Sequence, residues 1–501
     1  MQKKDCVFMG AAACALIVST SAWATVEVLY CQITGHSKAL VPAGAGLAPG
    51  TEFKVQIGTG FDRPYASSNG RKFFFTGLAN LATTEDECYI VVDNYGATAA
   101  TVAREGTAFG SPTGDLLGTG DQRMGINSNG HFVFGVDTNA VTTADKFVIK
   151  WDGANFVTVA REGDLIPGSA TETWGNGMNS GHILNDGQPV FCAVDTGGIN
   201  PTTTDDYCMV SNVIFRQTGD FVVGGTIWDA FNSSDVWATP DGSHTMIVGD
   251  DNSATTQDRI LALDNVVQAR EGVPLIGSSY VSNMSVGFGG TESLLCNDGS
   301  YLLRGHNVDL EDWVLRNGVV VASTDDPIVP ASTELFDDTP FGDCFFTIAG
   351  NAVGHYIVGG TTNAVDPNNN AVLILDGERI VLRENDMVDL NGNGLDDDDA
   401  FIATFNNDDC FLTDDLKLVL FADVRNAALV SLGQMVLKVD INTCPGDIAP
   451  PGGNGAVNIL DLLRVVQSWG HASGDPADVN DDGTVNILDL LLIVSQWGAC
   501  P

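Results

Sequence analysis

The sequence predicts a mainly β protein, a seven-bladed β-propeller followed by a small α-helical domain. A charged motif recurs with a period of roughly 57 residues, and a fixed period of that size is typical of repeat architectures. A turn glycine recurs at the same interval, and helix-favouring patterns occur only near the C-terminus. These three observations indicate the length of the repeat, the number of repeats and the place where the repeat region ends.

The motif is Val-Ala-Arg-Glu-Gly, and two independent landmarks count its repeats. Identical copies stand at Val102–Gly106 and Val159–Gly163, and close variants at Gln268–Gly272 and Val381–Asn385. Degenerate copies end at Gly219, Asp325 and Asp440. The turn glycines are Gly70, Gly130, Gly187, Gly242, Gly299 and Gly354, with Asp415 in the seventh copy. Both landmarks predict seven repeats.

The second repeat shows the expected unit most clearly. After the turn at Asn127–Gly130, strands are expected over His131–Val136, Phe147–Lys150 and Phe156–Glu162, with a shorter strand near Arg123–Ile126. Seven units of four antiparallel strands favour a propeller, in which stacked blades bury each other's faces. A β-solenoid is the alternative, but this repeat is long for one coil. Either Val26–Gly44 or Ala428–Asp440 could supply the strands that close the ring.

The recurring charged residues favour structure over catalysis. In each Arg-Glu pair the neighbouring side chains face opposite sides of a strand, and their repetition indicates structural ion pairs. His131, His244 and His355 follow the turn glycine in their repeats, so they serve packing or converge on a metal. We find no nucleophile elbow, zinc-protease helix or phosphate loop in the context that each chemistry needs. Catalytic residues are therefore unknown.

The net charge limits the class of partner, and the N-terminal sequence indicates the compartment. The net charge is −41, from 64 acidic and 23 basic residues, which disfavours nucleic acid and anionic membrane surfaces as partners. Lys3, Lys4, the apolar run Val7–Val18 and Ala22-Trp23-Ala24 predict an export signal, so an extracellular or cell-surface location is expected. No later stretch is long and apolar enough to span a membrane.

The export signal, the repeat region and the C-terminal helical region define the expected domains. The expected domains are a signal peptide over 1–24, a propeller over 25–443 and a calcium-binding domain over 444–501. In an exported protein cysteines are disulfide candidates. We expect Cys192 to pair with Cys208, and Cys444 to pair with Cys500.

One loop inside the repeat region carries a calcium-binding pattern. Its oxygen-bearing side chains stand at alternate positions, with Gly394 at the sixth position for the sharp turn that Ca²⁺ loops require. The expected ligands are Asp389, Asn391, Asn393 and Asp397. The twelfth position is Ala400, so a closing carboxylate would come from elsewhere.

The C-terminal domain contains two calcium-loop patterns, each followed by an amphipathic helix. The second loop fills every side-chain ligand position of such a loop: Asp478, Asn480, Asp482, Thr484 through its carbonyl, Asn486 and Asp489. The first offers Asp447, Asn454, Asn458 and Asp461. It is longer by three residues because Ala449–Gly453 is inserted, so we expect it to bind Ca²⁺ more weakly. The duplicated Asn-Ile-Leu-Asp-Leu-Leu starts at Asn458 and at Asn486.

These tandem loops resemble a type I dockerin domain, and the repeat region is similar to exported proteins of planctomycete-type bacteria. The resemblance implies Ca²⁺ binding and docking to a protein partner. Dockerins of the cellulosome type recognise cohesin through small hydroxylated residues before the closing Asp, where this chain has Ile459-Leu460 and Ile487-Leu488. An ordinary cohesin partner is therefore not expected. We expect the apolar helix residues to form chiefly the core of the domain.

Taken as a whole, the sequence predicts a secreted, calcium-binding, non-catalytic binding or scaffold protein. One alternative is a polysaccharide-degrading enzyme, a hydrolase or lyase, on a propeller scaffold, since dockerin resemblance implies the company of carbohydrate degradation. The other is a structural protein of the cell envelope in which dockerin-like modules pair chains. A glycan is a further candidate partner.

Overall fold

The computed structural model describes most of the chain from Val26 onward. The described residues are 26–56, 60–83, 85–110, 114–195, 204–273, 282–283, 293–307, 311–337, 343–395, 397–441, 446–449, 456–471, 475, 477–479, 484–495 and 497–499. The predicted signal peptide, Cys444 and Cys500 lie outside them.

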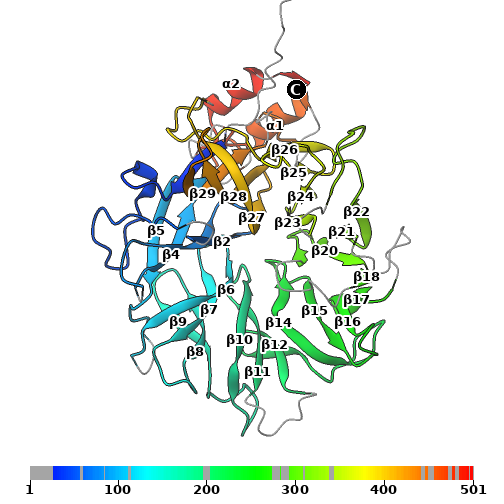
Figure 1. The fold of residues 1–501 in the computed structure, drawn as a ribbon. Coiled ribbons are helices and arrows are strands. Elements are labelled where there is room, and N and C mark those ends of the chain that lie inside the picture. Colours follow the sequence, from blue (N-terminus) through cyan, green and yellow to red (C-terminus); the bar gives the residue numbers. More distant parts are fainter. Residues whose placement is uncertain are drawn as a thin grey trace, which may run out of the picture.

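Seven antiparallel sheets form a ring, and Figure 1 shows them with α1 and α2 outside it. Blade one contains β2 (Phe61–Ala66), β3 (Phe73–Leu78), β4 (Glu87–Asp93) and β5 (Thr98–Arg104). Blade two contains β6 (Leu117–Ile126), β7 (Phe132–Thr138), β8 (Lys146–Trp151) and β9 (Phe156–Arg161). Blade three contains β10 (Trp174–Ile183), β11 (Pro189–Asp195), β12 (Asp206–Val210) and β13 (Val213–Gln217). Blade four contains β14 (Trp228–Ala238), β15 (Thr245–Asp251), β16 (Arg259–Leu263) and β17 (Val266–Arg270).

The remaining blades follow the same order. Blade five contains β18 (Ser282–Asn283), β19 (Ser293–Leu295), β20 (Tyr301–Asn307), β21 (Asp312–Arg316) and β22 (Val319–Ser323). Blade six contains β23 (Phe345–Gly350), β24 (Tyr356–Thr361), β25 (Ala371–Leu375) and β26 (Arg379–Arg383). Blade seven contains β27 (Phe401–Leu412), β28 (Lys417–Arg425), β29 (Ser431–Asp440) and β1 (Val26–Cys31). Short 3₁₀ turns lie at Ser37–Ala39 and Asn94–Gly96. The prediction of a seven-bladed propeller is confirmed.

The core lies between the blades. Each large apolar cluster draws on two neighbouring sheets, as when Phe74 and Tyr89 of blade one pack with Phe132 and Phe134 of blade two. The rings of Phe74 and Phe132 stack with centroids 4.5 Å apart. Because every blade buries both faces in this way, strands of modest hydrophobicity share one continuous core around the ring.

In the second repeat, the three outer strands lie where the sequence predicts them, within one or two residues at each end. The innermost strand differs, because β6 begins at Leu117 and not near Arg123. Its pairing with β7 shifts register on both sides of Gly120. Bulged, glycine-containing strands lack the alternation of apolar and polar residues from which strands are predicted. The predicted strand is therefore shorter than β6.

Ring closure uses both segments that the sequence offered. β29 is the third strand of blade seven, and β1 pairs with it as the outermost strand, with Val28 opposite Leu437. The other side of β1 meets the loop after β26, where the amide of Asp389 donates to the carbonyl of Val26 at 2.9 Å. The N-terminal strand therefore completes the last blade.

The recurrent arginine ties each outer strand to a loop of its own blade. The arginine donates to a backbone carbonyl in the loop between the second and third strands: Arg104 to Glu85, Arg161 to Ala144, Arg270 to Gln257 and Arg383 to Asn369. In blade three Gln217 makes the same contact with Thr204. This repetition supports a structural role for the recurrent arginine.

The contact of one recurrent arginine, Arg270, with Asp251 is expected to contribute strongly to stability. The side chain of Asp251 is fully buried and lies 2.6 Å from Arg270. Burial raises the pKa of Asp251, but hydrogen bonds from Arg270, Ser253 and the amide of Thr226 outweigh burial and bring the pKa to about 2. We expect Arg270→Ala to lower the free energy of unfolding by about 3–5 kcal/mol, because it leaves a buried carboxylate without its cation.

Urea unfolding at pH 7 measures this loss. The matched control is Arg104→Ala, whose partner Glu85 has a half-exposed side chain, and the expected cost is about 1 kcal/mol or less. Because the folded pKa of Asp251 is depressed, its contribution is present above pH 3.8 and is lost as the pH falls towards 2. Equal losses in the two variants at pH 7 would contradict this account.

Two of the three repeated histidines make polar contacts within their own blades. His244 and His355 each approach an aspartate of the neighbouring hairpin, Asp264 and Asp376, at 2.7 Å. A Cβ atom on Gly299 of blade five would lie 2.7 Å from the His244 ring, so this turn glycine is required by the close approach. In the seventh copy the residue with positive φ is Leu416 and not the expected Asp415, because the turn starts one residue later.

The cysteine pair in blade three is brought together. Cys192 and Cys208 are buried, stand opposite each other on β11 and β12, and their sulfur atoms lie 2.8 Å apart. The disulfide stays a prediction. Within the described residues, no helix combines the length and apolar character needed to cross a membrane.

Candidate functional site

The C-terminal region contains two short helices that share one core. α1 (Ile459–Gln467) and α2 (Ile487–Ser495) contact each other, and β30 (Ala456–Val457) pairs with β31 (Gly498–Ala499). Val457, Val465, Ala477, Val485 and Ile493 are fully buried together. The ends of the region are thus tied by strand pairing and its centre by apolar packing.

The two closing aspartates occupy equivalent, fully buried positions at the helix starts. Asp461 accepts hydrogen bonds from the amides of Asn458, Ile448 and Ala449, each at 2.7 Å. Asp489 accepts the bond equivalent to that from Asn458, from the amide of Asn486 at 2.7 Å. Both have no exposed surface. The duplication in sequence is therefore a duplication in geometry, with one carboxylate anchoring each helix to its loop.

Each loop contains a second buried carboxylate, which fits a cation. Asp447 in the first loop and Asp478 in the second are 9% and 3% exposed. Two buried carboxylates in one short loop are costly unless donors or a metal ion neutralise them. Oxygen ligands at this spacing suit Ca²⁺. The residues present therefore fit the cation that the sequence predicts.

The remaining predicted ligands of these loops are partly described. Asn458 and Asn486 cap the helices through their side chains, which accept from the amides of Leu460 and Leu488. The amide group of Asn486 also donates to the carbonyl of Thr484 at 2.8 Å. Asn454, Asn480 and Asp482 lie outside the described residues. The ligand sets of both loops stay predictions.

The four predicted ligands of the propeller loop also come close together. Asp389 is buried and accepts from the amides of Gly392, Asn393 and Gly394. The side-chain amide of Asn393 donates to Asp397 at 3.1 Å. Asn391 donates instead to Asp398 at 2.7 Å, a residue that the sequence analysis had not placed among the ligands. This loop holds itself by hydrogen bonds, and its Ca²⁺ site stays a prediction.

The apolar residues of the two helices divide into a core face and an exposed face. Leu462, Val465, Leu490 and Ile493 point into the core. Five residues of each repeat, spaced identically, are about half exposed: Ile459, Leu460, Leu463, Val466 and Trp469 in the first, and Ile487, Leu488, Leu491, Val494 and Trp497 in the second. We call these ten residues the twin apolar face. The expectation that this stripe is chiefly core holds for only part of it.

The centre of the ring contains a cavity of about 170 Å³, lined by residues of all seven blades. His182 and Trp237 line it, with ring centroids 4.5 Å apart, beside Cys410 and Asp408. Asp408 pairs with Arg304 at 2.7 Å. At the turn end, Asn297 of blade five donates to the carbonyl of Ser68 of blade one at 2.9 Å, which narrows that end of the cavity.

Sequence analysis also missed a histidine with two aspartates in blade five: His306, Asp312 and Asp343, here called the blade-five triad. The signal was available in part, because His306 is out of register with the repeated histidines that follow the turn glycines. Asp343, however, follows a connection between blades, where no spacing pattern predicts its position.

Comparison with known proteins assigns the C-terminal region. Residues 452–496 match the family model of the dockerin type I domain, which includes every predicted ligand of the two loops except Asp447. No curated protein matches the chain.

Solved structures resemble the repeat region at low identity. A puromycin hydrolase mutant shares 12% identity, with 78% of this chain and 56% of that chain covered and a TM-score of 0.38. Prolyl oligopeptidase B from Galerina marginata shares 10%, with 77% and 49% covered and a TM-score of 0.35. The β-propeller domain of the Trilobed protease from Pyrococcus furiosus shares 8%, with 77% and 94% covered and a TM-score of 0.37.

This chain thus spans about half the length of the first two of these structures. TM-scores this low support no inference about activity. The family match and the sheet topology together assign the parts of the chain: a seven-bladed β-propeller that is followed by a dockerin region.

Proposed function

We propose that this protein is an exported, non-catalytic scaffold that docks to a protein partner through the twin apolar face when Ca²⁺ is bound. In this proposal residues 1–24 direct export, residues 25–443 form the propeller and residues 444–501 form the docking module. The N-terminal pattern supports export. A dockerin region supports docking as the central activity.

The twin apolar face is the observation that carries the proposal. Ten apolar residues, each between 45% and 58% exposed, lie on two short helices and just beyond the ends of these helices. Exposed apolar clusters of this density are typical of interaction sites. Two of the ten are tryptophans, Trp469 and Trp497, and aromatic side chains are enriched among residues that dominate binding energy. An apolar partner surface suits this face better than a hydroxyl-rich one.

Calcium would act by positioning this face. Ile459 and Ile487 are the first residues of α1 and α2, and the closing aspartates stand two residues later, at Asp461 and Asp489. A cation that binds each closing carboxylate fixes the start of the helix on which the face lies. Docking should therefore require both loops to be loaded.

The propeller supports the scaffold role. Its repeated arginines are engaged by loop carbonyls, and two of its repeated histidines lie beside aspartates. These residues stabilise the blades, so the loops between the strands are free to vary and can form a binding surface.

The decisive test is a double substitution within the twin apolar face. Leu463→Asp with Leu491→Asp should weaken Ca²⁺-dependent binding to a responsive cohesin-type domain at least tenfold, measured by calorimetry with the full chain against a panel of such domains. Both side chains are about half exposed, so the fold should survive. Leu429→Asp, at an equally exposed propeller leucine, is the matched control and should leave binding unchanged.

Other outcomes separate the alternatives. A Ca²⁺-dependent dimer that the double substitution abolishes would identify a second copy of the chain as the partner, as in an envelope structural protein. Release of soluble sugars from polysaccharide by the wild-type chain would contradict the non-catalytic role. Binding to a partner that survives the double substitution would contradict docking through this face.

A further inference from the structure

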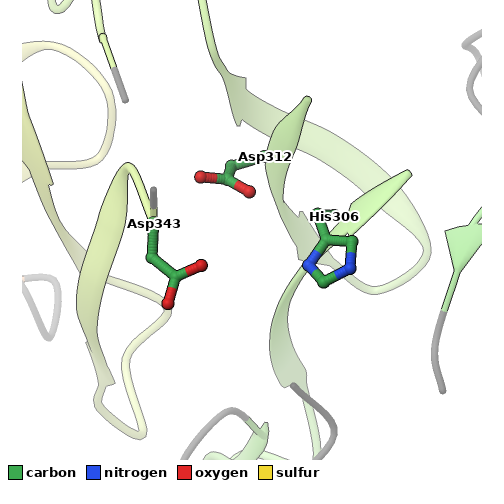
Figure 2. A group of neighbouring side chains, drawn as sticks. All are labelled: His306, Asp312 and Asp343. Atoms are coloured by element: carbon green, nitrogen blue, oxygen red, sulfur yellow. The ribbon is translucent and has the colours of Figure 1, made fainter. Parts of the chain in front are cut away.

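The blade-five triad lies where three elements of two blades meet. His306 is near the end of β20, and Asp312 begins β21. These two residues stand opposite each other across the strand pair. Asp343 comes just before β23, the inner strand of blade six. One nitrogen or oxygen atom from each side chain lies within 4.8 Å of the other two, and Figure 2 shows the three side chains around a common space.

The fold fixes this arrangement from two sides. Directly paired residues of antiparallel strands carry their side chains on the same face, which places His306 beside Asp312. Asp312 is 5% exposed, and its carboxylate accepts a hydrogen bond from the amide of Cys344. Cys344 is the buried residue that follows Asp343, so this bond also holds Asp343 at the group. Preorganised ligands with such supporting bonds are typical of metal sites.

Comparison with blade three separates the structural part of this arrangement from the rest. There Asp206 begins β12 and accepts the amide of Phe231 at 3.1 Å, as Asp312 accepts that of Cys344. The residue opposite Asp206 is Val194, and the residue before Phe231 is Ala230. Blade three thus has the aspartate and its hydrogen bond to the next blade but no other metal ligand. Blade five has His306 in place of Val194 and Asp343 in place of Ala230.

In blades two and four the first residue of the third strand and the residue opposite it form an ion pair. Lys146 pairs with Asp137 at 3.4 Å and Arg259 with Asp250 at 3.1 Å, in both cases as cross-strand neighbours. A histidine opposite Asp312 could serve the same ion pair when protonated. A cross-strand ion pair needs one carboxylate, however, and the triad has two. Within the described chain, this is the single group of three His, Cys, Asp or Glu side chains whose ligand atoms all lie within 4.8 Å of one another.

We propose that His306, Asp312 and Asp343 bind a divalent transition-metal ion of the zinc type. One imidazole nitrogen and two carboxylate oxygens are ordinary ligands of Zn²⁺, which takes four ligands in tetrahedral sites. Three protein ligands leave a position for water or a substrate group. Asp343 is exposed, so this position is reached from solvent. The site is separate from the Ca²⁺ loops, whose oxygen ligands suit a harder cation.

The site also connects blade five to blade six. His306 and Asp312 belong to blade five, while Asp343 leads into β23 of blade six. An ion that all three bind joins the two sheets and binds the folded chain more tightly than the unfolded one. Zinc should therefore raise the melting temperature of the propeller, by an amount that increases with the logarithm of the zinc concentration above the Kd.

The test is calorimetric titration of the full chain with ZnCl₂ in saturating CaCl₂. We expect one zinc equivalent whose affinity falls at least tenfold in Asp343→Asn and in His306→Gln, since loss of even a supporting residue weakens metal binding tenfold or more. Asp343 is exposed, so Asp343→Asn should fold as the wild type does. The zinc-dependent rise in melting temperature, measured at one zinc concentration, should be smaller in both variants than in the wild type.

Two matched controls use the same residue types elsewhere in the propeller. Asp137→Asn removes an exposed carboxylate from the corresponding edge of blade two, and His355→Gln removes a histidine that pairs with Asp376. Both should keep the zinc equivalent and its thermal shift. A zinc isotherm that neither Asp343→Asn nor His306→Gln alters would overturn the proposal, as would one that the two controls alter equally.

Discussion

Val28→Asp is expected to lower the free energy of unfolding of the propeller by at least about 4 kcal/mol, because it buries an unpaired charge in the strand that closes the ring. Val28 is 1% exposed, although it lies on an outermost strand. It belongs to the apolar cluster between blades six and seven. Urea unfolding followed by the fluorescence of buried Trp228 and Trp313 measures the loss.

The size of this effect follows from what β1 does. It joins the first segment of the propeller to β29, with Lys438 and Glu27 forming an ion pair at 2.6 Å between the two strands. Its other side is covered by the loop that starts at Asp389. A strand that is paired on one side and covered on the other cannot move its side chains to water. An aspartate at Val28 must therefore be desolvated or separate β1 from the sheet.

Val319→Asp is the matched control for this substitution. Val319 also lies on an outermost strand, β22 of blade five, but is 51% exposed. Its substitution should cost about 1 kcal/mol or less, since the new carboxylate stays in water. If both substitutions cost the same, β1 would be an ordinary edge strand, and closure would depend on β29 alone.

The same strand shows where prediction from sequence ends. The repeat period predicted the blades because each blade is built from local hairpins, whose patterns lie within one repeat. Closure pairs residues such as Val26 and Val439, which no local pattern connects. Two segments had suitable strand patterns, and the sequence offered no way to see that both are used side by side.

Metal sites show the same limit. The ligands of the second Ca²⁺ loop are contiguous from Asp478 to Asp489, so spacing alone predicted them. The blade-five triad joins His306 and Asp312 to Asp343, on the far side of a blade connection. Its geometry depends on how two blades stack, which sequence periodicity does not specify. The exposed half of the helix residues was also missed, because amphipathic spacing identifies a face but not what covers it.

Removal of Ca²⁺ should unfold the dockerin region and leave the propeller intact. Asp447, Asp461, Asp478 and Asp489 are all buried in a region with a very small apolar core. Without a cation these carboxylates repel one another and remain desolvated, and few apolar contacts oppose them. At a free Ca²⁺ concentration of 100 times Kd, each bound ion contributes about 2.7 kcal/mol to folding. The binding free energy is therefore a large part of the folding free energy of this region.

Scanning calorimetry of the full chain in Ca²⁺ and in chelator measures this dependence. We expect the transition of residues 444–501 to disappear in chelator and return with Ca²⁺, while the propeller transition stays. A C-terminal transition that chelator does not move would contradict a structural role for the ion. Asp241→Asn, which alters a carboxylate in a propeller turn, controls for general effects of charge and should change neither transition's response to Ca²⁺.

The two loops should differ in how much each closing carboxylate contributes. Asp489→Ala should weaken Ca²⁺ binding more than Asp461→Ala, because the second loop has the complete ligand pattern and the first contains the insertion Ala449–Gly453. Asp461 accepts three amide hydrogen bonds at the helix start, so its carboxylate is already partly neutralised without an ion. Calorimetric Ca²⁺ titration of both variants decides the point. Equal losses of affinity would show that the insertion leaves the first loop's ligands in place.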